Sequence, residues 1–378
     1  MMTVLTVFGT RPEAIKMAPV IMELGKHSSC VRSVICSVAQ HREMLDQVLS
    51  IFGIEPHYDL NLMQPDQSLC RLTANLFAGL EPVVCEVKPD WILAQGDTTT
   101  VFVAAMVAFY RGIAFGHVEA GLRTGDRARP FPEEINRRLA DAVATAYFAP
   151  TENARQALLR EGCSERHIYV TGNTVVDALH DAASREYDWG SGPLSRLPVE
   201  NRLVLITAHR RESFGSPFRE MCLAIRDLSR IFLRDGVHFV YPVHLIPNVR
   251  QPVQDILSGL SNVSLIEPLD YLSLVNLMKR STLILTDSGG IQEEAPALRI
   301  PVLVMRDTTE RPEGVHEGVV RLVGTDRCRI IHETKRLLRD AAAHRAMAKG
   351  VSPYGDGRAA KRIVSVLLGR SGDGTLSR

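Results

Sequence analysis

Short apolar runs alternate with segments of helical spacing along the chain. Runs rich in β-branched and aromatic residues predict strands, and the segments between them carry apolar residues at the helical period. In the first half, strands are predicted at 4–8, 32–38, 91–94 and 113–117, with helices near 40–52 and 68–87. In the second half, strands are predicted at 203–207, 239–243, 264–266, 282–286 and 302–305. This alternation predicts parallel sheets with helices on both faces.

One stretch, 171–201, departs from the alternation. It is rich in glycine, proline and serine, above all between Trp189 and Pro193, which is typical of a surface connection. A chain of 378 residues is long enough for two domains. We therefore predict an α/β fold with two Rossmann-like domains. The first is placed at 1–171, joined by a C-terminal helix at about 364–378, and the second at 172–363.

The composition is that of a globular enzyme: 45% of the residues are apolar, 23% are charged and the formal net charge is +1. This balance gives no reason to expect nucleic acid or an anionic membrane as a partner. The seven cysteines are scattered and form no C-x-x-C pair, which argues for a reducing compartment and against a zinc site. No apolar run approaches the length of a membrane span. We expect a cytoplasmic protein.

The stretch 282–313 contains a candidate anion site. A predicted strand leads through a Ser-Gly-Gly turn at 288–290 into a segment of helical spacing. Glycines let a ligand approach the backbone, and the free N–H groups at a helix N-terminus bind phosphate oxygens. Glu293 or Glu294, in the first helical turn, could reach a ribose diol. The alternative is an ordinary capped strand–helix turn with an acidic first turn, and this stretch alone leaves both open.

Polar clusters follow the predicted strands in both halves. In open parallel sheets, ligands bind beyond the carboxyl ends of the strands, so polar clusters on that rim indicate a site. Cations there suit a diphosphate, because guanidinium and ammonium groups neutralise its oxygens. The cationic candidates are Arg11, Lys16, His209, Arg210, Arg211 and Arg311.

Three carboxylates, Asp97, Glu119 and Glu133, are candidates for general acid and base chemistry. Glu133 could instead begin a helix whose N-terminal dipole it complements, as could Glu134. His209 is open to three interpretations: a phosphate ligand, a proton carrier or a loop histidine with satisfied hydrogen bonds. Spacing does not decide among them.

Motifs for common cofactors are absent from the sequence. The G-x-G-x-x-A match at 355–360 follows Ser-Pro-Tyr rather than a strand, so it is a poor dinucleotide fingerprint. There is no Walker A loop, no G-x-S-x-G elbow and no tyrosine with a lysine four residues later. We expect no nicotinamide cofactor.

Taken together, the motifs resemble the bacterial non-hydrolysing UDP-N-acetylglucosamine 2-epimerases, in family order from about Val4 to Ile363. The matching stretches are VFGTRPEAIKMAPV, AQHREMLDQVL, QGDTTT, GHVEAGLRTGD, PFPEEINRRL, TGNTVVDAL, AHRRESFG, YPVHL, TDSGGIQEEAP and MRDTTERPE. The resemblance implies a GT-B fold with UDP bound by the second domain and the active site in the cleft between the domains. It also implies a homodimer that converts UDP-GlcNAc to UDP-ManNAc for cell-surface polysaccharide, with no cofactor and no metal.

The resemblance carries over the following site residues. Asp97, Glu119, Glu133 and His209 are implied to be catalytic, and which carboxylate is base and which acid stays open. The residues implied to bind substrate are Arg11, Lys16, Arg137, Arg211, His244, Leu274, Ser288, Gly289, Gly290, Glu294 and Arg311.

The sequence departs from the family at a few positions. Leu274 stands where close relatives often carry a phenylalanine near the uracil, so the apolar contact is kept and ring stacking is lost. Glu43 and Asp66 are acidic where activation by a second substrate molecule needs amide and basic side chains, so we expect no such activation.

Three other functions remain in view. One is a hydrolysing epimerase that releases ManNAc and UDP. A second is a GT-B glycosyltransferase, and a third is a nucleotide-sugar-binding regulator without turnover.

Overall fold

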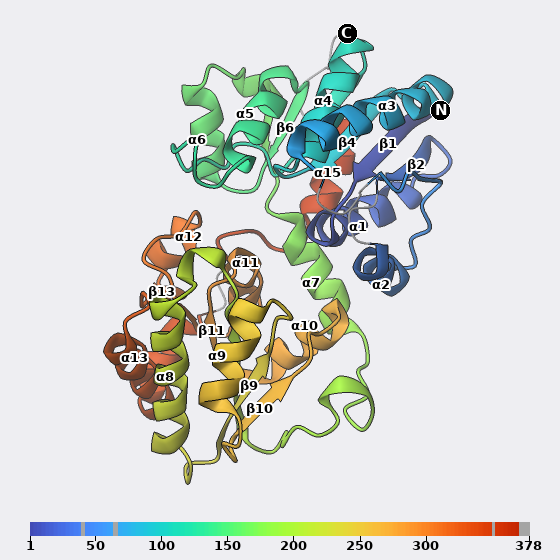
Figure 1. The fold of residues 1–378 in the computed structure, drawn as a ribbon. Helices are drawn as coiled ribbons and strands as arrows, with labels where there is room; N and C mark the ends of the chain where they lie inside the picture. The colour runs from blue at the N-terminus through green and yellow to red at the C-terminus, as the bar shows by residue number, and fades with distance from the viewer. Residues whose placement is uncertain (39–41, 63–66, 350–351, 370–378) are drawn as a thin grey trace. The chain divides into compact units, whose positions relative to one another are not determined.

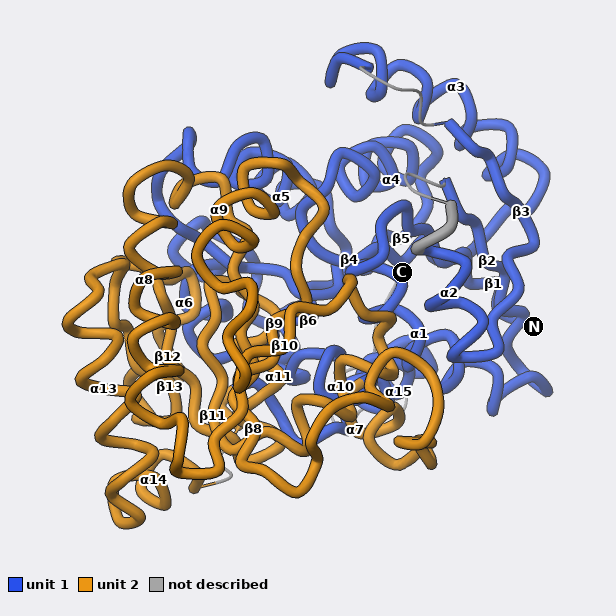
Figure 2. Tube along the Cα trace, turned by 60° about the horizontal axis from the view of Figure 1, so that its bottom comes forward, with its two compact units in different colours: residues 1–178, 354–378 blue, residues 179–353 orange. Residues whose placement is uncertain are grey.

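The chain folds into two compact units in a computed structural model, which describes residues 1–38, 42–62, 67–349 and 352–369, without the side chains of 42–44. The first unit comprises Met1–Ala178 and the segment that starts at Tyr354, and the second is Leu179–Pro353 (Figure 2). The division falls within helix α7 (Thr174–Ser184), a little after the predicted crossing near Gly172. Helix α15 (Ala359–Leu367) begins before the predicted position 364 and belongs to the first unit.

The sheet of the first unit is parallel, and its described strands follow the order β3-β2-β1-β4-β5-β6-β7. The strands are β1 (Met2–Phe8), β2 (Val31–Ser37), β3 (Tyr58–Asp59), β4 (Trp91–Gln95), β5 (Ala114–Val118), β6 (Ala146–Ala149) and β7 (Ile168–Val170). Val4, Leu5, Val7 and Phe8 of β1 are all fully buried, because helices cover both faces of the sheet.

The helices of the first unit form two layers, and strands and helices alternate along the chain (Figure 1). On one face, α4 packs between α3 and α5, and its sequence is accordingly apolar on almost all sides. On the other face, α1 packs against α2 and α15. The helices are α1 (Arg11–Gly25), α2 (Arg42–Phe52), α3 (Leu69–Val87), α4 (Thr99–Tyr110), α5 (Glu133–Val143) and α6 (Glu152–Arg160).

The second unit repeats this plan with a parallel sheet, in which the described strands follow the order β10-β9-β8-β11-β12-β13. The strands are β8 (Arg202–Thr207), β9 (Val237–Pro242), β10 (Val263–Ile266), β11 (Ser281–Thr286), β12 (Val302–Val304) and β13 (Val320–Leu322). Helix α8 packs against α9 and α13 over one large apolar core, while α10 and α11 contact the sheet. The helices are α8 (Ser216–Ile231), α9 (Pro247–Leu257), α10 (Tyr271–Arg280), α11 (Gly289–Ala297), α12 (Pro312–His316), α13 (Arg327–Arg339) and α14 (Ala341–Met347).

The strand order reverses direction once in each sheet, between β1 and β4 in the first unit and between β8 and β11 in the second. At such a switch point the loops from neighbouring strands diverge, and they leave a crevice at the carboxyl ends where ligands bind in open α/β sheets. The predicted doubly wound architecture is confirmed, together with every predicted strand. Strands β3, β6, β7 and β13 were not predicted, and the predicted helix start at Gln40 lies outside the described residues.

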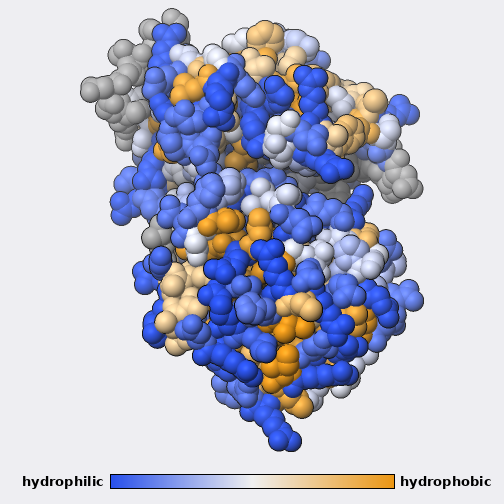
Figure 3. Space-filling model, turned by 90° about the vertical axis from the view of Figure 1, so that its left-hand side faces the viewer, coloured by the Kyte–Doolittle hydropathy of each residue, from blue (hydrophilic) through white to orange (hydrophobic). Residues whose placement is uncertain are grey.

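In the part of the chain that the structure describes, no helix is both long enough and apolar enough to cross a membrane. On the face drawn in Figure 3, hydrophobic residues are interspersed with hydrophilic ones.

Gly116 of β5 offers a test of packing in the first core. A Cβ at this position would lie 2.5 Å from Leu93 Cδ2 and 3.0 Å from Phe148 Cε2, and both of these side chains are fully buried. We expect Gly116→Ala to lower the free energy of unfolding by about 1–3 kcal/mol, because a full core has to shift to admit the methyl group. Gly25→Ala, with no atom within 4 Å of the new Cβ, is the control and should change it by less than about 0.5 kcal/mol. Equal denaturant midpoints for the two variants would contradict this description of the core.

Candidate active site

The loops that follow β1 and β4 are tied together by the buried carboxylate of Glu13. Its Oε2 accepts the N–H groups of Gly9 (3.1 Å) and Thr10 (2.7 Å), and its Oε1 accepts the hydroxyl of Thr98 (2.7 Å). Burial raises the pKa of Glu13, and these donors partly offset the rise. Thr10 and Glu13 also form the capping box that starts α1. Sequence reasoning missed Glu13, although the Thr-x-x-Glu spacing before an apolar helix is visible.

Two predicted residues, Lys16 and Glu119, meet in the first unit. Lys16 Nζ lies 2.5 Å from Glu119 Oε2, and Asn173 Nδ2 donates to the same oxygen at 2.8 Å. All three side chains are buried. Glu119 has a φ of 67°, a left-handed conformation that only surrounding structure can impose on a residue with a side chain. Asn173 was not among the predicted site residues, although it lies in the matched stretch TGNTVVDAL.

Asp97, at the end of β4, is held by α5. Its carboxylate is ion-paired with Arg137, and its carbonyl oxygen accepts the side-chain amide of Asn136 at 3.0 Å. The side chain of Asp97 is 27% exposed while that of Arg137 is 7% exposed. The carboxylate is therefore oriented by a buried cation and is still accessible to a substrate.

Glu133 and Glu134 occupy the first turn of α5 but differ in surroundings. Glu134 is fully buried, and its carboxylate accepts the N–H groups of Thr124 (3.1 Å) and Gly125 (3.3 Å). It therefore fixes the loop before α5, as a structural carboxylate. Glu133 is half-buried at the first position of the helix, and Arg11 is half-buried at the first position of α1.

In the second unit, the carboxylate of Asp287 accepts backbone N–H groups of a loop, as that of Glu13 does in the first unit. Asp287 is fully buried after β11, and its Oδ2 accepts the N–H groups of His209 and Arg210, both at 2.7 Å. The second oxygen lies 3.9 Å from His209 Nδ1. The ring of His209 stacks on that of His244, with 5.2 Å between the centroids. Burial and the neighbouring His209 lower the pKa of His244.

The Ser-Gly-Gly turn at 288–290 forms the N-terminus of α11, where cations converge. A Cβ on Gly289 would lie 2.8 Å from Arg311 Nη1 and 3.3 Å from Arg210 Nη2. Glycine thus leaves room for two guanidinium groups beside the free N–H groups of the helix end. This is the charge arrangement that binds phosphate.

The cations at this site are held by carboxylates. Arg311 Nε lies 2.5 Å from Glu293 Oε1, and Arg306 is bound by both oxygens of Glu310 at 3.0 and 3.2 Å. Burial opposes ionisation of Glu310, but Arg306 and Arg311 outweigh it and lower its pKa from 4.5 to about 2. Burial and the nearby charge of Arg306 lower the pKa of Arg210.

Glu294 and Leu274 belong to the same part of the second unit. Glu294 Oε1 accepts the hydroxyl of Tyr271 at 2.9 Å, and a Cβ on Gly290 would lie 3.6 Å from its Oε2. Tyr271 begins α10, and Leu274 follows in that helix, half-buried.

Some of the residues named from the sequence are not part of the clusters described above. Arg211 is exposed in the 3-10 turn Arg211–Ser213. Asp66 and the side chain of Glu43 lie outside the described residues. Predicted residues also fall into two groups by unit: Arg11, Lys16, Asp97, Glu119, Glu133 and Arg137 in the first, and His209, Arg211, His244, Leu274, Ser288, Gly289, Gly290, Glu294 and Arg311 in the second.

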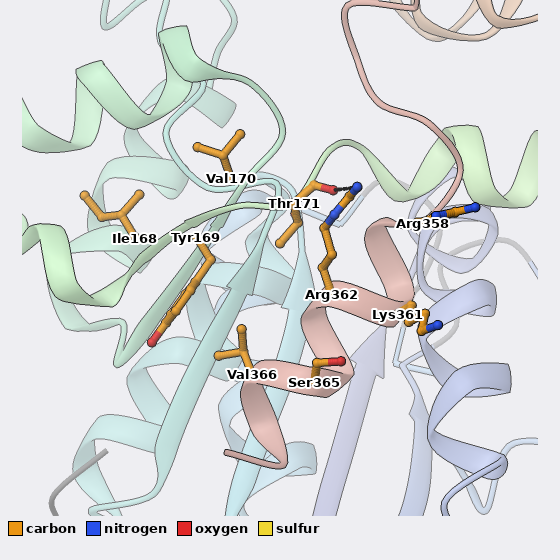
Figure 4. A pocket seen from close by; sticks show the side chains of 9 residues that line it. All are labelled: Ile168, Tyr169, Val170, Thr171, Arg358, Lys361, Arg362, Ser365 and Val366. Carbon is orange, nitrogen blue, oxygen red and sulfur yellow. Dashed lines mark hydrogen bonds between the residues drawn. The ribbon is translucent and has the colours of Figure 1, made fainter. Parts of the chain in front are cut away.

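A groove of about 600 Å³ in the first unit lies between β7 and α15 (Figure 4). Arg362 reaches from α15 to the carbonyl oxygen of Thr171 (3.0 Å) and is ion-paired with Asp356 (2.7 Å). No predicted site residue lines this groove.

Comparison with known proteins identifies similar chains over almost the whole length. A family model described as "UDP-N-acetylglucosamine 2-epimerase" matches residues 23–368. The UDP-N-acetylglucosamine 2-epimerase of Escherichia coli K12 is 52% identical over 372 residues, which cover 97% of this chain and 98% of that protein.

Solved structures agree. The Neisseria meningitidis UDP-GlcNAc 2-epimerase bound to UDP-GlcNAc is 48% identical with a TM-score of 0.88, covering 97% of this chain and 100% of that one. The Methanocaldococcus jannaschii enzyme in complex with UDP-GlcNAc and UDP is 34% identical with a TM-score of 0.81, covering 97% and 99%. With the two doubly wound sheets, these likenesses confirm the predicted GT-B-type fold.

The lowered pKa of Glu310 predicts how stability depends on pH. Because this pKa falls from 4.5 to about 2 on folding, the stabilisation is complete above pH 4.5 and is lost as the pH falls towards 2. Glu310→Gln should therefore lower the free energy of unfolding near neutral pH by about 2–3 kcal/mol, and the difference from the wild type should shrink on acidification. Denaturant titrations at several pH values measure it.

Glu317→Gln is the matched control for this experiment, since Glu317 is exposed in the same segment. Its stability should follow that of the wild type at every pH. A constant difference between wild type and Glu310→Gln down to pH 3 would contradict the assignment of this ion pair.

Proposed function

The chain belongs to the UDP-N-acetylglucosamine 2-epimerase family and is an epimerase; from this premise we propose that it follows the non-hydrolysing course. In this course, UDP-GlcNAc and UDP-ManNAc interconvert through elimination and re-addition of UDP. One observation carries the proposal. The N-terminus of α11 faces the Arg311 and Arg210 guanidinium groups across Gly289, which suits a diphosphate that must both leave and return.

The chemistry explains why the departing diphosphate needs such a site. The proton on C-2 of the sugar is barely acidic, because no carbonyl is adjacent, so a base alone cannot remove it. When the bond from C-1 to the UDP oxygen breaks, UDP takes the electron pair and C-1 gains oxocarbenium character. The C-2 proton then passes to a base, and its electron pair forms the C-1=C-2 double bond of 2-acetamidoglucal. Protonation of C-2 on the opposite face and return of UDP to C-1 give the epimer.

The second unit would hold the nucleotide. Arg210 and Arg311 neutralise the diphosphate together with the N–H groups of the turn 288–290, and Glu294 is positioned by Tyr271 to accept the ribose hydroxyls. Leu274, in the helix that Tyr271 begins, gives the uracil an apolar contact. The Neisseria meningitidis and Methanocaldococcus jannaschii structures hold UDP-GlcNAc, which supports the same ligand here.

Proton transfer would fall to Asp97, Glu119, Glu133 and His209. Asp97 is accessible and oriented by Arg137. Glu119 is held in a left-handed backbone conformation against Lys16. His209 has its backbone N–H fixed by the buried carboxylate of Asp287.

The biological setting proposed for this reaction rests on the family resemblance. We propose a cytoplasmic homodimer that supplies UDP-ManNAc for cell-surface polysaccharide. A hydrolysing epimerase would share the carboxylates and would let water attack C-1, and a non-catalytic binder would need only the residues of the second unit.

A proton NMR time course with UDP-GlcNAc in D2O, with no added cofactor, tests the proposal. We expect UDP-ManNAc to appear with deuterium at C-2 and only traces of free UDP, because the eliminated UDP is captured again. Free ManNAc with an equal amount of UDP would replace the proposal by the hydrolysing course. Absence of any sugar product, with UDP still bound, would favour the binder.

Asp97→Asn separates catalysis from binding. The amide keeps the size of the side chain and removes its proton-transfer capacity, so turnover should fall by at least about 100-fold. The dissociation constant for UDP, measured by calorimetry, should change less than about twofold, since the proposed nucleotide residues lie in the second unit. Asp255→Asn, on the exposed side of α9, is the control and should match the wild type in both measurements.

A further inference from the structure

His117, the next-to-last residue of β5, is a fully buried histidine with both ring nitrogens bonded. Nδ1 lies 2.6 Å from Asp141 Oδ1, and Nε2 lies 2.7 Å from the carbonyl oxygen of Gly96. Gly96 is the residue before Asp97 and has a φ of 88°. The histidine therefore contacts both the turn that carries a proposed catalytic carboxylate and the helix α5 that holds it.

The bonding partners determine how many protons the ring carries. A carbonyl oxygen can only accept, so Nε2 must carry a hydrogen. Asp141 Oδ2 accepts the guanidinium of Arg123 at 2.7 Å and the N–H of Gly121 at 3.3 Å, and both contacts favour the ionised carboxylate. An ionised Asp141 beside Nδ1 requires a hydrogen there as well. Both nitrogens are donors, and the ring is an imidazolium.

The charged groups around this pair are consistent with that assignment. Burial opposes charge on both groups, but their mutual attraction outweighs it, so the pKa of His117 is raised and that of Asp141 is lowered. Arg123, which faces Asp141 from the loop after β5, is itself neutralised by Glu161 at the end of α6 (2.7 Å). The hydroxyl of Tyr147, from β6, donates to the Asp141 carbonyl at 3.1 Å.

Asp141 lies one helical turn beyond Arg137 on α5. The His117–Asp141 pair thus anchors the Gly96–Asp97 turn at one end and, at the other, the helix whose Asn136 and Arg137 grip Asp97. Asp97 in the turn and Arg137 in the helix are 40 residues apart in sequence. A rigid charged link between them fixes the direction of the Asp97 carboxylate.

We propose that His117, as an imidazolium, is a positioning residue for the epimerase reaction, which sets the orientation of Asp97 through Gly96 and α5. The inference rests on the proposed function, since it assigns Asp97 a part in proton transfer. His117 does not itself touch the sugar, because it is fully buried behind the turn.

Two substitutions divide the roles of the two ring nitrogens. His117→Gln places an amide N–H near the Nε2 position, so it can keep the bond to Gly96 and loses the charge. His117→Asn places its N–H near the Nδ1 position and loses the bond to Gly96. We expect His117→Asn to lower kcat by about 10- to 100-fold, with KM and the UDP dissociation constant changed less than about twofold. His117→Gln should recover at least part of that loss.

His332→Gln, at an exposed histidine on α13, is the control and should have the kcat of the wild type. A folded His117→Asn with wild-type kcat would overturn the positioning role. So would equal losses in kcat, KM and UDP affinity for both His117 variants, since that pattern indicates a general structural defect.

NMR of the wild type labelled with ¹⁵N-histidine gives a readout that does not depend on turnover. The two protonated nitrogens of His117, assigned by their absence in His117→Gln, should persist from pH 6 to pH 8. Asp141→Asn should leave only one of them at neutral pH. A wild-type ring with one unprotonated nitrogen at pH 7 would overturn the imidazolium.

The NMR result also separates this inference from the proposed function. If the wild type fails to epimerise UDP-GlcNAc, the proposed function is wrong. The catalytic reason for the His117–Asp141 link is then lost as well, whatever the protonation state of the His117 ring. If the wild type epimerises UDP-GlcNAc and the His117 ring is neutral, only the inference about His117 is wrong.

Discussion

The candidate site depends on two buried carboxylates, one at the switch point of each sheet. Loops that leave the carboxyl ends of parallel strands carry backbone N–H groups that no neighbouring strand can bond. Glu13 accepts two such groups after β1 and a hydroxyl after β4, and Asp287 accepts two after β8. Removing a carboxylate from water is costly, and these donors offset the cost. Each loop pair is thereby fixed at the switch point, where open α/β sheets generally bind their ligands.

The carboxylate that binds the loop N–H groups comes from a different element in each unit. This difference determines what chemistry each unit can do. In the first unit the carboxylate comes from helix α1, so the end of β4 is left free to present Asp97. In the second unit the carboxylate ends strand β11 itself, and the helix that follows begins with glycines. Its N-terminus is therefore open to guanidinium groups and a phosphate. The first unit can thus offer accessible carboxylates and the second an anion site, although both have the same strand plan.

Much of the fold was predictable because buried parallel strands are continuous apolar runs, as β1 and β11 illustrate. The four missed strands give little such run: β3 has two residues, β7 and β13 have three, and β6 has four. The rule that ligands bind beyond strand ends singled out Lys16 and Glu119, and the fold brings these side chains together although they are 103 residues apart in sequence. It did not assign a role to Glu13, His117 or Asn173. These residues act on backbone groups and on other side chains, and only the hydrogen bonds of the folded chain reveal such roles.

The arginine cluster of the second unit is held in place by carboxylates of the protein itself. Glu293 fixes Arg311, and Glu310 fixes Arg306, so these guanidinium groups would lose little further conformational freedom on binding the proposed diphosphate. Arg210 differs, because Glu310 approaches it only to 4.0 Å, while burial and Arg306 lower its pKa. A diphosphate would supply the counter-charge that Arg210 lacks most. In the proposed elimination, UDP would carry more negative charge after it leaves the sugar than before, so its contact with Arg210 would strengthen as the bond to C-1 breaks. An interaction that strengthens in this way speeds the reaction rather than only holding the substrate.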